Sequence, residues 1–340
     1  MGIRFSLAAV VALVLVSFLG VRAAGLDHFF GVTLPYIAIL AFLGGVVFRT
    51  LRWARSPVPF CIPTTAGQQK SLSWIPYSRF DNPVTKAQTV GRMLLEVLVF
   101  RSLFRNTKSE LQKGAKLYYQ WEKWLWLAGL AFHYAFLVIL IRHLRFFTEP
   151  VPFFVHGVEG LDGLWQVGLP GIYMTDLVFM LAVTYLLIRR LIIPQVRYIS
   201  LPQDYFPLFL LFAIGTTGIL TRYFTRVDLI KVKQLAMGLI SFKPVVPEGI
   251  GVVFFIHLFL VSVLFAYFPF SKLMHAGGVL LSPTRNLPND SRIRRHINPW
   301  NYPVKVHTYA QYEDHFREKM VEAGLPVEKE LDEAAVTAED

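Results

Sequence analysis

The 340-residue sequence has few charged residues, and this shortage excludes most soluble classes. Only 17% of its residues are charged, whereas soluble domains carry roughly a quarter. Too little polar surface is therefore present to cover a soluble globule. With 54% hydrophobic residues and a mean hydropathy of +0.46, extensive disorder is excluded as well. The composition predicts a membrane protein.

Cysteine is almost absent, because Cys61 is the single one. One cysteine excludes internal disulfides, cysteine-ligated iron–sulfur clusters and covalently attached c-type haem within this chain. Any redox metal must then be held by histidine or oxygen ligands, or by another subunit. The formal charge of +11 more often reflects basic cytoplasmic loops than nucleic acid in a membrane protein, so no nucleic-acid partner is expected.

Six stretches are apolar over the roughly 20 residues that a helix needs to cross a bilayer. They predict an all-α integral membrane bundle of about six transmembrane helices. The first stretch has an alternative as a signal peptide, because a basic residue precedes it and Val21-Arg22-Ala23 precedes a possible cleavage site. The stretches are residues 5–22, 34–53, 124–146, 173–193, 205–225 and 250–273.

Basic residues are missing from two of the segments between these stretches. Residues 24–33 and 147–172 contain no Lys or Arg, whereas 54–120 contains ten against three acidic residues. By the positive-inside rule, 54–120 is cytoplasmic and the other two segments are outside. The expected protein is thus a multi-pass protein of the cytoplasmic membrane with both termini cytoplasmic. The outer loop 226–249 is an exception, with four basic residues.

These features predict four parts of the chain. Two N-terminal transmembrane helices occupy 1–53, a basic cytoplasmic loop 54–120, a four-helix domain 121–273 and a cytoplasmic tail 274–340. Within the loop, apolar residues recur at helical spacing over 88–104, which predicts an amphipathic helix. This helix either lies on the inner leaflet or packs against a partner. The tail begins basic and ends acidic, so it either docks on a cytoplasmic partner or frays.

Four of the nine histidines lie in or just beyond two apolar stretches. Ionisable groups at membrane depth are costly and usually serve a function. A lone histidine could be a core residue, but four on two antiparallel spans favour bis-histidine binding of haem b, which takes one imidazole from each of two facing helices. Loop charge places one histidine of each span toward the outer face and one toward the inner face, so two haems are predicted. The four are His133 and His143 in the third stretch, and His257 and His275 at the sixth.

Spacing alone leaves the pairing of these histidines open. Ten residues of helix cover about 15 Å and eighteen cover about 27 Å, a mismatch that tilt, Pro269 or a position of His275 beyond the helix end must absorb. Arg142 and Arg145 flank the outer histidine of the third stretch. They either pair with haem propionates or extend to the outer headgroups.

The gaps of 10 and 18 residues resemble those of the nitrate reductase gamma subunit family over roughly residues 120–280. In that family, paired histidines on two such spans bind two b haems. The resemblance therefore implies a dihaem domain in 121–273 with the pairs His133/His275 and His143/His257. The additional N-terminal span departs from the family's five-span pattern, so its quinol-site details are not carried over.

Loop motifs are similar to one branch, the haem b membrane subunits of dissimilatory sulfate-reduction complexes (the DsrM type). Membrane subunits of heterodisulfide reductase share this architecture. The motifs are Ile62-Pro-Thr-Thr-Ala-Gly-Gln-Gln-Lys-Ser71, Phe80-Asp-Asn-Pro83, Phe270-Ser-Lys-Leu-Met-His-Ala-Gly-Gly278, Ser282-Pro-Thr-Arg-Asn-Leu-Pro-Asn-Asp290 and Asn298-Pro-Trp300.

The resemblance implies a quinone-linked electron conduit with two haem b and menaquinone as cofactors. Its implied partners are a cytoplasmic iron–sulfur, heterodisulfide reductase-like subunit of the DsrK type, and other membrane and multihaem subunits. A gamma-type subunit of a nitrate or heterodisulfide reductase is the alternative within the class, and a haem-free transporter or anchor lies outside it. Candidate quinone-site residues in the outer segments are His156, Glu159, Asp162 and Asp176.

Overall fold

The computed structural model describes residues 2–58, 67–112, 116–293, 300 and 303–329. The chain divides into two compact units, 1–293 and 294–340, which are described separately. Parts of the predicted motifs, residues 62–66 and 298–299, lie outside the described residues, as do Arg294, Arg295 and the chain after residue 329.

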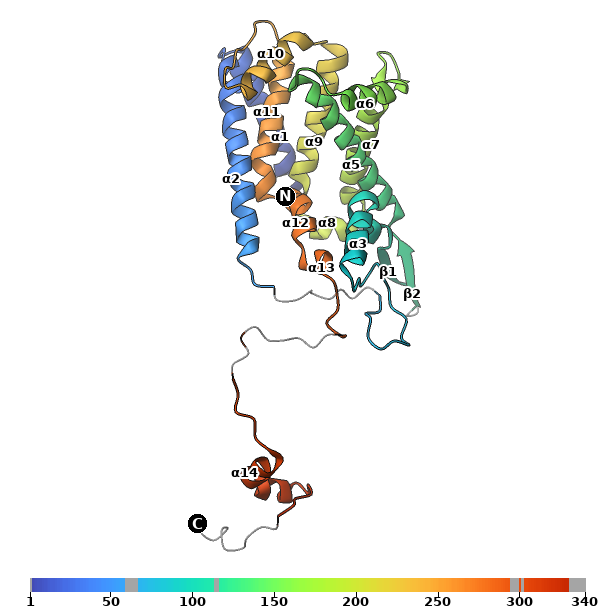
Figure 1. Ribbon diagram of the computed structural model, residues 1–340. Helices are drawn as coiled ribbons and strands as arrows, with labels where there is room; N and C mark the ends of the chain where they lie inside the picture. Colours follow the sequence, from blue (N-terminus) through green and yellow to red (C-terminus); the bar gives the residue numbers. More distant parts are fainter. Residues whose placement is uncertain (1, 59–66, 113–115, 294–299, 301–302, 330–340) are drawn as a thin grey trace. The chain divides into compact units, whose positions relative to one another are not determined.

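Long helices form a bundle in the first unit (Figure 1). Contacts run from α5 to α7, from α7 to α9, and from α9 to both α1 and α11, which also contact each other. Helix α2 packs on α11. The six helices are α1 (Gly2–Arg22), α2 (Leu34–Ala54), α5 (Lys123–His143), α7 (Met174–Ile192), α9 (Pro202–Ile219) and α11 (Val252–Tyr267).

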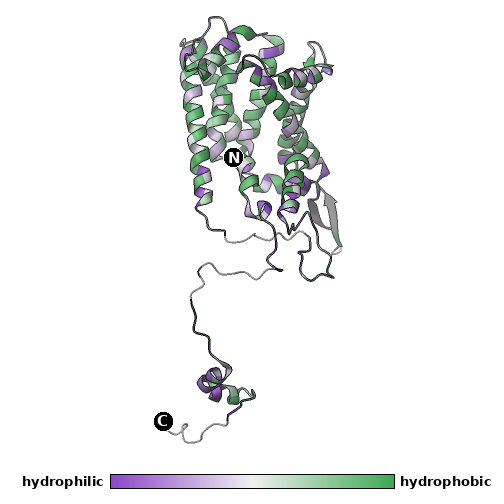
Figure 2. Cartoon of the chain, in the orientation of Figure 1, coloured by the Kyte–Doolittle hydropathy of each residue, from purple (hydrophilic) through white to green (hydrophobic). Residues whose placement is uncertain are grey.

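Five helical stretches of the described chain are long and apolar enough to cross a membrane. They confirm the predicted all-α membrane bundle, and Figure 2 shows hydrophobic residues along the length of its helices. The fourth predicted stretch, 173–193, forms α7, which is not one of the five and carries three charged residues. The five are Gly2–Arg22, Phe29–Ala54, Lys123–Phe146, Pro202–Phe224 and Val252–Phe270.

Short turns extend several of these helices. A π-helical turn, η1 (Phe29–Thr33), leads into α2, and another, η3 (Leu220–Phe224), continues α9. The 3₁₀ turn η2 (Leu144–Phe146) continues α5 beyond His143. Each apolar run is thereby longer than its α-helix alone.

We name the two ends of the bundle by their short helices. The α10 end carries α6 (Phe153–Gly163), the small hairpin of β3 (Gln166–Val167) and β4 (Ile172–Tyr173), and α10 (Leu229–Ile240). The α12 end carries the remaining short elements of this unit. These are α3 (Lys86–Val99), α4 (Arg101–Phe104), β1 (Thr107–Gln112) paired antiparallel with β2 (Lys116–Trp121), α8 (Pro194–Ile199), α12 (His275–Leu281) and α13 (Pro283–Asn286).

Helix α9 stands at the centre of the core. On one side, its Leu211 packs with Ala135 of α5 and Val183 of α7. On another side, its Leu210 packs with Val10 of α1 and Leu260 of α11. The histidine-bearing helices α5 and α11 are therefore both positioned by contacts with shared neighbours.

The sixth apolar stretch is not one continuous helix. Helix α11 ends at Tyr267, and two 3₁₀ turns follow, η4 (Phe268–Phe270) and η5 (Lys272–Met274). Pro269 has no backbone N–H for a helical bond, and the Ser271 hydroxyl caps the next turn by accepting from the backbone N–H of Leu273 at 3.1 Å. His275 then begins α12, so the break changes the course of the chain between His257 and His275.

The second unit contains α14 (Tyr309–Glu322). Thr308 and Gln311 form a capping box at its start, and Gly324, with φ of +70°, follows its end. The buried Glu313 carboxylate accepts from the backbone N–H groups of Glu328 at 2.9 Å and Lys329 at 2.8 Å. The segment after α14 is therefore fastened back onto the helix.

Candidate functional site

The structure brings His133 and His275 together at the α12 end. Their ring centres lie 6.0 Å apart and their ring planes meet at 87°. The Phe100 ring, from the turn between α3 and α4, packs edge-on against His133 with centroids 4.9 Å apart. His275 is exposed at the start of α12.

His143 and His257 form the second pair, toward the α10 end. Their ring centres lie 6.4 Å apart and their planes are close to parallel, at 21°. Gly218 of α9 lies beside the His257 ring, and a Cβ at this position would be 3.2 Å from its Cε1 atom. Glycine thus lets α9 approach the imidazole closely.

All four histidines bond to a backbone carbonyl through Nδ1. A carbonyl only accepts, so Nδ1 carries the proton and Nε2 keeps its lone pair free. Histidines that ligate metals are commonly oriented in this way. The carbonyls belong to Gly129 for His133 (2.7 Å), Ile139 for His143 (2.7 Å), Ile214 for His257 (3.1 Å) and Lys272 for His275 (2.9 Å).

The separations fit a metal ion between two imidazoles. A metal–imidazole bond of about 2 Å places the two ligating nitrogens about 4 Å apart and the ring centres about 6 Å apart. The observed distances are 6.0 and 6.4 Å. No cluster of three or more His, Cys, Asp or Glu suited to a metal occurs among the described residues. Each pair could thus hold a group such as haem through its two imidazoles.

Arg142, beside His143, is buried in a charged network. Its guanidinium pairs with Asp162 of α6 at 2.8 Å and with Asp176 of α7. Asp176 also accepts from the Tyr223 hydroxyl at 2.6 Å, and the guanidinium lies over the Tyr173 ring at 4.9 Å. Arg142 therefore joins α5, α6 and α7 and does not extend toward solvent or headgroups.

The other predicted residues at this end are arranged differently. Arg145 pairs with Glu159, whose carboxylate also lies 3.6 Å from the Arg222 guanidinium. His156 is exposed on α6. The four predicted quinone-site residues thus do not converge on one point, because three are in ion pairs and His156 stands apart.

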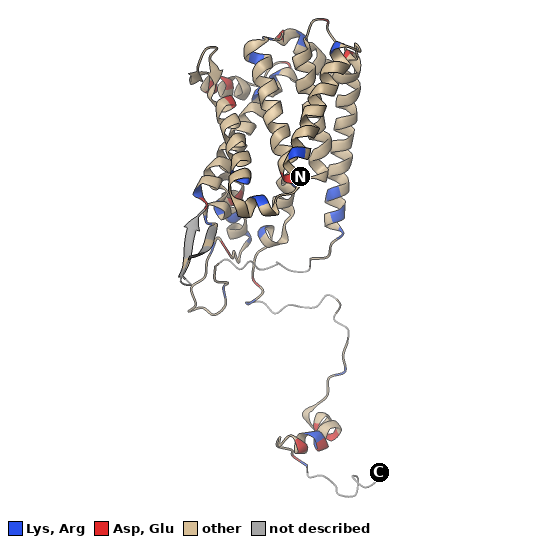
Figure 3. Cartoon of the chain, turned by 180° about the vertical axis from the view of Figure 1, so that it is seen from behind, with Lys and Arg blue, Asp and Glu red and all other residues tan. Residues whose placement is uncertain are grey.

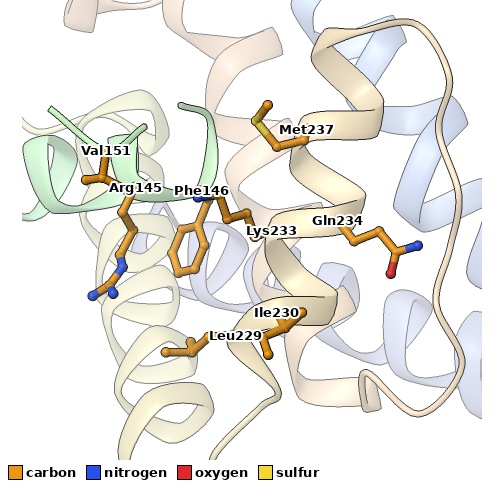
Figure 4. Close-up of a pocket in the computed structure, with 8 residues that line it drawn as sticks. All are labelled: Arg145, Phe146, Val151, Leu229, Ile230, Lys233, Gln234 and Met237. Carbon is orange, nitrogen blue, oxygen red and sulfur yellow. The ribbon is translucent and has the colours of Figure 1, made fainter. Parts of the chain in front are cut away.

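A cavity of about 480 Å³ opens at the α10 end. Figure 4 shows its walls, formed by α10 on one side and the chain after α5 on the other. Phe146 connects it to the histidines, since its ring centre lies 6.0 Å from that of His143. The cavity is mainly apolar with a few polar groups, as small-molecule sites usually are. Its lining residues are Arg145, Phe146, Val151, Leu229, Ile230, Lys233, Gln234 and Met237.

At the α12 end, a polar clamp holds the chain that follows His275. Arg92 of α3 donates to the Thr284 carbonyl at 3.1 Å, and Glu96 accepts from Arg285 at 3.0 Å. Asn289 donates to the Asn82 side chain at 2.8 Å. We define the polar clamp as Asp81, Asn82, Arg92, Glu96, Arg285 and Asn289.

Asp81 is a carboxylate of this clamp with a strongly shifted pKa. Burial alone would raise its pKa, but hydrogen bonds from Arg101 (2.6 Å), Ser78 (2.6 Å) and Arg105 (2.5 Å) outweigh burial and hold the pKa well below its usual value. Asp81 is therefore ionised at any physiological pH. The Phe80–Pro83 and Ser282–Asp290 motifs contain four clamp residues: Asp81, Asn82, Arg285 and Asn289. The sequence did not indicate that the two motifs contact each other.

Comparisons with known proteins identify the family. A family model described as nitrate reductase gamma subunit matches residues 93–290. A protein of Archaeoglobus fulgidus named Hdr-like menaquinol oxidoreductase cytochrome b-like subunit is 48% identical over 279 residues, covering 80% of this chain and 83% of that protein. Its namesake in Archaeoglobus profundus is 44% identical over 277 residues, covering 79% and 81%. These matches confirm the predicted family: the chain belongs to the nitrate reductase gamma subunit family of membrane proteins, on the branch of the Hdr-like cytochrome b-like subunits.

Proposed function

We propose that the chain is a dihaem cytochrome b subunit that exchanges electrons between menaquinol and a cytoplasmic iron–sulfur subunit. The observation that carries this proposal is the pair of imidazole sites, His133/His275 and His143/His257, each with the right spacing and Nδ1 bonding for axial ligation. Haem b would supply one-electron transfer. The protein's part is to orient the four imidazoles and to exclude water from the half-buried His143/His257 pair.

Loop charge supports the sidedness of this proposal. The basic segment 54–120 leads into the α12 end, which we assign to the cytoplasm, with the α10 end outside. Figure 3 shows Lys and Arg mainly toward the two ends of the bundle. Both termini are then cytoplasmic in a multi-pass protein of the cell membrane, and His143/His257 is the outer pair.

The cavity beside Phe146 supports a quinone site at the outer pair. A quinone headgroup needs an apolar enclosure with a few polar groups, and Arg145 and Lys233 supply cations beside such a surface. Glu159, Asp162 and Asp176 lie in neighbouring ion pairs and hold the arginines in place. His156 remains a candidate only as an exposed group on α6.

Haem propionates have two candidate partners at the outer pair. Arg145 is partly exposed, and among the described ion pairs its guanidinium contacts only Glu159. Arg142 is already shared by Asp162 and Asp176. We therefore expect Arg145 to bind a propionate directly, and Arg142 to do so only by weakening one of its carboxylate contacts.

The names of the Archaeoglobus relatives favour an Hdr-like partner. We propose a cytoplasmic iron–sulfur subunit of the DsrK type that meets the α12 end, within a complex that includes other membrane and multihaem subunits. The loop motifs quoted above resemble the DsrM type and support a role in dissimilatory sulfur metabolism. The relatives' names do not mention sulfate.

Haem content and visible spectra test the proposal. Purified chain should contain about two haems b, read as pyridine haemochrome per protein, with b-type bands in the reduced-minus-oxidised spectrum. Absence of haem would overturn the conduit and favour an anchor or transporter. A value near one would mean that one pair is assigned wrongly.

Sidedness needs a second experiment, in vesicles that hold the chain, its iron–sulfur partner, a menaquinol analogue and an electron acceptor. Protons released outside and electrons delivered inside should build a potential, positive outside, worth about 2.3 kcal/mol per charge per 100 mV. His143→Ala should slow reduction by quinol far more than it affects assembly. Normal reduction without a potential would place the quinone site on the cytoplasmic side.

A further inference from the structure

Helix α3 has its polar side turned inward and its apolar side outward. Thr89, Arg92 and Glu96, spaced as one helix face, are buried. After Lys86 and Ala87, every exposed residue of α3 is aliphatic. These residues are Val90 (59% exposed), Leu94 (54%), Val97 (43%), Leu98 (51%) and Val99 (42%).

This arrangement is the reverse of a helix on a water-soluble protein, whose apolar stripe faces the core and whose charges face water. The polar side is not left unsatisfied, since Arg92 and Glu96 belong to the polar clamp. An outward surface of adjacent aliphatic residues is stable only against another apolar phase. The surroundings of α3 are therefore apolar.

The C-terminal end of α3 is fastened to α5. The Leu98 carbonyl accepts from the Tyr134 hydroxyl at 2.9 Å, and the Val99 carbonyl accepts from the Trp126 indole N–H at 2.7 Å. Helix-end carbonyls lack partners within the helix, and in a bilayer they must find donors within the protein. Two side chains of a membrane-spanning helix provide them here.

These bonds indicate the depth of α3. Tyr134 lies eleven residues beyond Lys123, the first residue of α5, which is about 16 Å along the helix axis. A bilayer core is about 30 Å thick, and a tyrosine in a helix leans back toward the N-terminus by part of its length. The indole donor, Trp126, lies three residues beyond Lys123, about 5 Å along the axis. The end of α3 therefore lies between these two depths, inside the half of the core next to the α12 end.

Directly after α3, the chain turns back toward the α12 end. Phe100 adopts a left-handed backbone conformation, with φ of 52°, which ends α3 and starts α4 in a new direction. Arg101 and Arg105 then direct their guanidinium groups to Asp81, at 2.6 and 2.5 Å. Their charges are thereby brought to the polar clamp and away from the aliphatic face.

We propose that α3 and α4 form a re-entrant helical hairpin embedded in the leaflet at the α12 end, with lipid acyl chains covering Val90, Leu94, Val97 and Leu98. This apolar face belongs to α3, whose end bonds to α5. On α5, Leu127 (47% exposed) and Leu137 (48%) present an aliphatic surface of the same kind. Beyond Lys86 at its start, the charged residues of the hairpin are bonded to the polar clamp, which matches a hydrocarbon neighbour rather than an aqueous one.

The hairpin has a consequence for the His133/His275 site. Its turn residue, Phe100, lies against the His133 ring, so the hairpin separates this imidazole from the lipid that covers the other face of α3. The inference goes beyond the proposed function and does not depend on haem. A chain without haem would leave it intact, and failure of the hairpin would leave the histidine pairs intact.

Depth-dependent fluorescence quenching tests the hairpin. In a Cys61→Ser background, a bimane label is placed by Leu94→Cys, and the full chain is reconstituted in phosphatidylcholine vesicles with brominated acyl chains. Leu137→Cys on α5 is the lipid-facing control, and Leu325→Cys in the second unit, 54% exposed, is the control outside the bundle. The Leu94→Cys label should lose as much fluorescence to bromine as Leu137→Cys, and should resist aqueous iodide.

Each other outcome overturns the proposal. Quenching by iodide and not by brominated lipid, as expected for Leu325→Cys, would place α3 in water. Protection from both quenchers would mean that protein covers this face. Because Leu94→Cys could distort the helix, Val90→Cys, one turn nearer the exposed Lys86, gives an independent reading. It should be quenched best by lipids brominated close to the headgroup.

Discussion

The two histidine pairs are built by different means. At the His143/His257 pair, which we propose is the outer one, His257 lies inside α11, and its Nδ1 atom bonds across to the Ile214 carbonyl of α9. At the other pair, His275 lies beyond the end of α11 and bonds to the carbonyl of Lys272, three residues before it. The first position follows from helix packing, and the second depends on what holds α12 in place.

This difference shows where each site is vulnerable. Core residues on five helices, α1, α5, α7, α9 and α11, position His143 and His257. His275, in contrast, begins a helix of seven residues whose following segment is held by the polar clamp. Substitutions far from His275 in sequence should therefore disturb its site and leave the outer pair unchanged.

Removal of single histidines should have the largest effect. His143→Ala or His257→Ala should remove the outer haem, so that content falls from about two per chain to about one. His133→Ala and His275→Ala should remove the other one. Spectra recorded during redox titration identify which component is lost. Loss of the same component in His133→Ala and His257→Ala would show that the pairing is wrong.

The polar clamp provides the next largest effect. Glu96→Ala leaves Arg285 without its carboxylate and the Ser102 hydroxyl without its acceptor, which should cost about 1–3 kcal/mol of unfolding free energy. The redox potential of the His133/His275 haem should shift, while the outer haem keeps its own. Glu318→Ala, at an exposed position of α14, is the matched control. Equal shifts at both haems would contradict separate construction.

A double-variant cycle sharpens this test. If Glu96 and Arg285 act as a pair, Glu96→Ala and Arg285→Ala together should cost less stability than the sum of the two single changes. Strict additivity would mean that the ion pair does not couple α3 to the segment after α12.

A smaller change should affect only the outer pair. In Gly218→Ala, the new Cβ lies 3.2 Å from Cε1 of His257, so the ring or the helix must move by a few tenths of an ångström. The haem should stay bound with an altered spectrum. Gly44→Ala on α2 is the control, because nothing lies within 4 Å of its Cβ. An unchanged spectrum in Gly218→Ala would show that α9 does not constrain His257.

Acid should have the smallest effect. The pKa of Asp81 is lower in the folded protein than its ordinary value of 3.8, so its contacts stabilise the fold above that pH and are lost only as pH falls through the lowered value. The His133/His275 spectrum should therefore stay constant from pH 8 to about 4.5. Asp81→Asn, which removes the charge at every pH, should weaken this site throughout. A transition near pH 4 in the unaltered chain would contradict the role of Asp81.

The helices of the bundle were predictable because each apolar run is long enough to span a bilayer. The stretch 173–193 shows the limit of that reasoning, since α7 carries Asp176, which is satisfied by Arg142 of α5. Hydropathy counts such a charge as a cost, whatever its partner. Only the fold shows that the charge is paired.

The positions of the histidines in the apolar stretches predicted where the two sites lie, but not which residues surround them. Asn82 and Asn289 lie 207 residues apart in sequence and bond directly, and no local pattern encodes such a contact. The helical spacing over 88–104 predicted two faces on one helix. It did not reveal that the polar face is the buried one, because periodicity does not identify the solvent on either side.

The break after Tyr267 also bears on how this protein can change over evolution. In one unbroken helix, eighteen residues would fix the direction of His275 relative to His257. The two turns at Phe268–Met274 remove that constraint. Insertions or substitutions there can re-aim His275 while α11 keeps its register with α9. The geometry of the His143/His257 site is thus tied to the packing of the bundle, whereas the position of His275 can change without altering that packing.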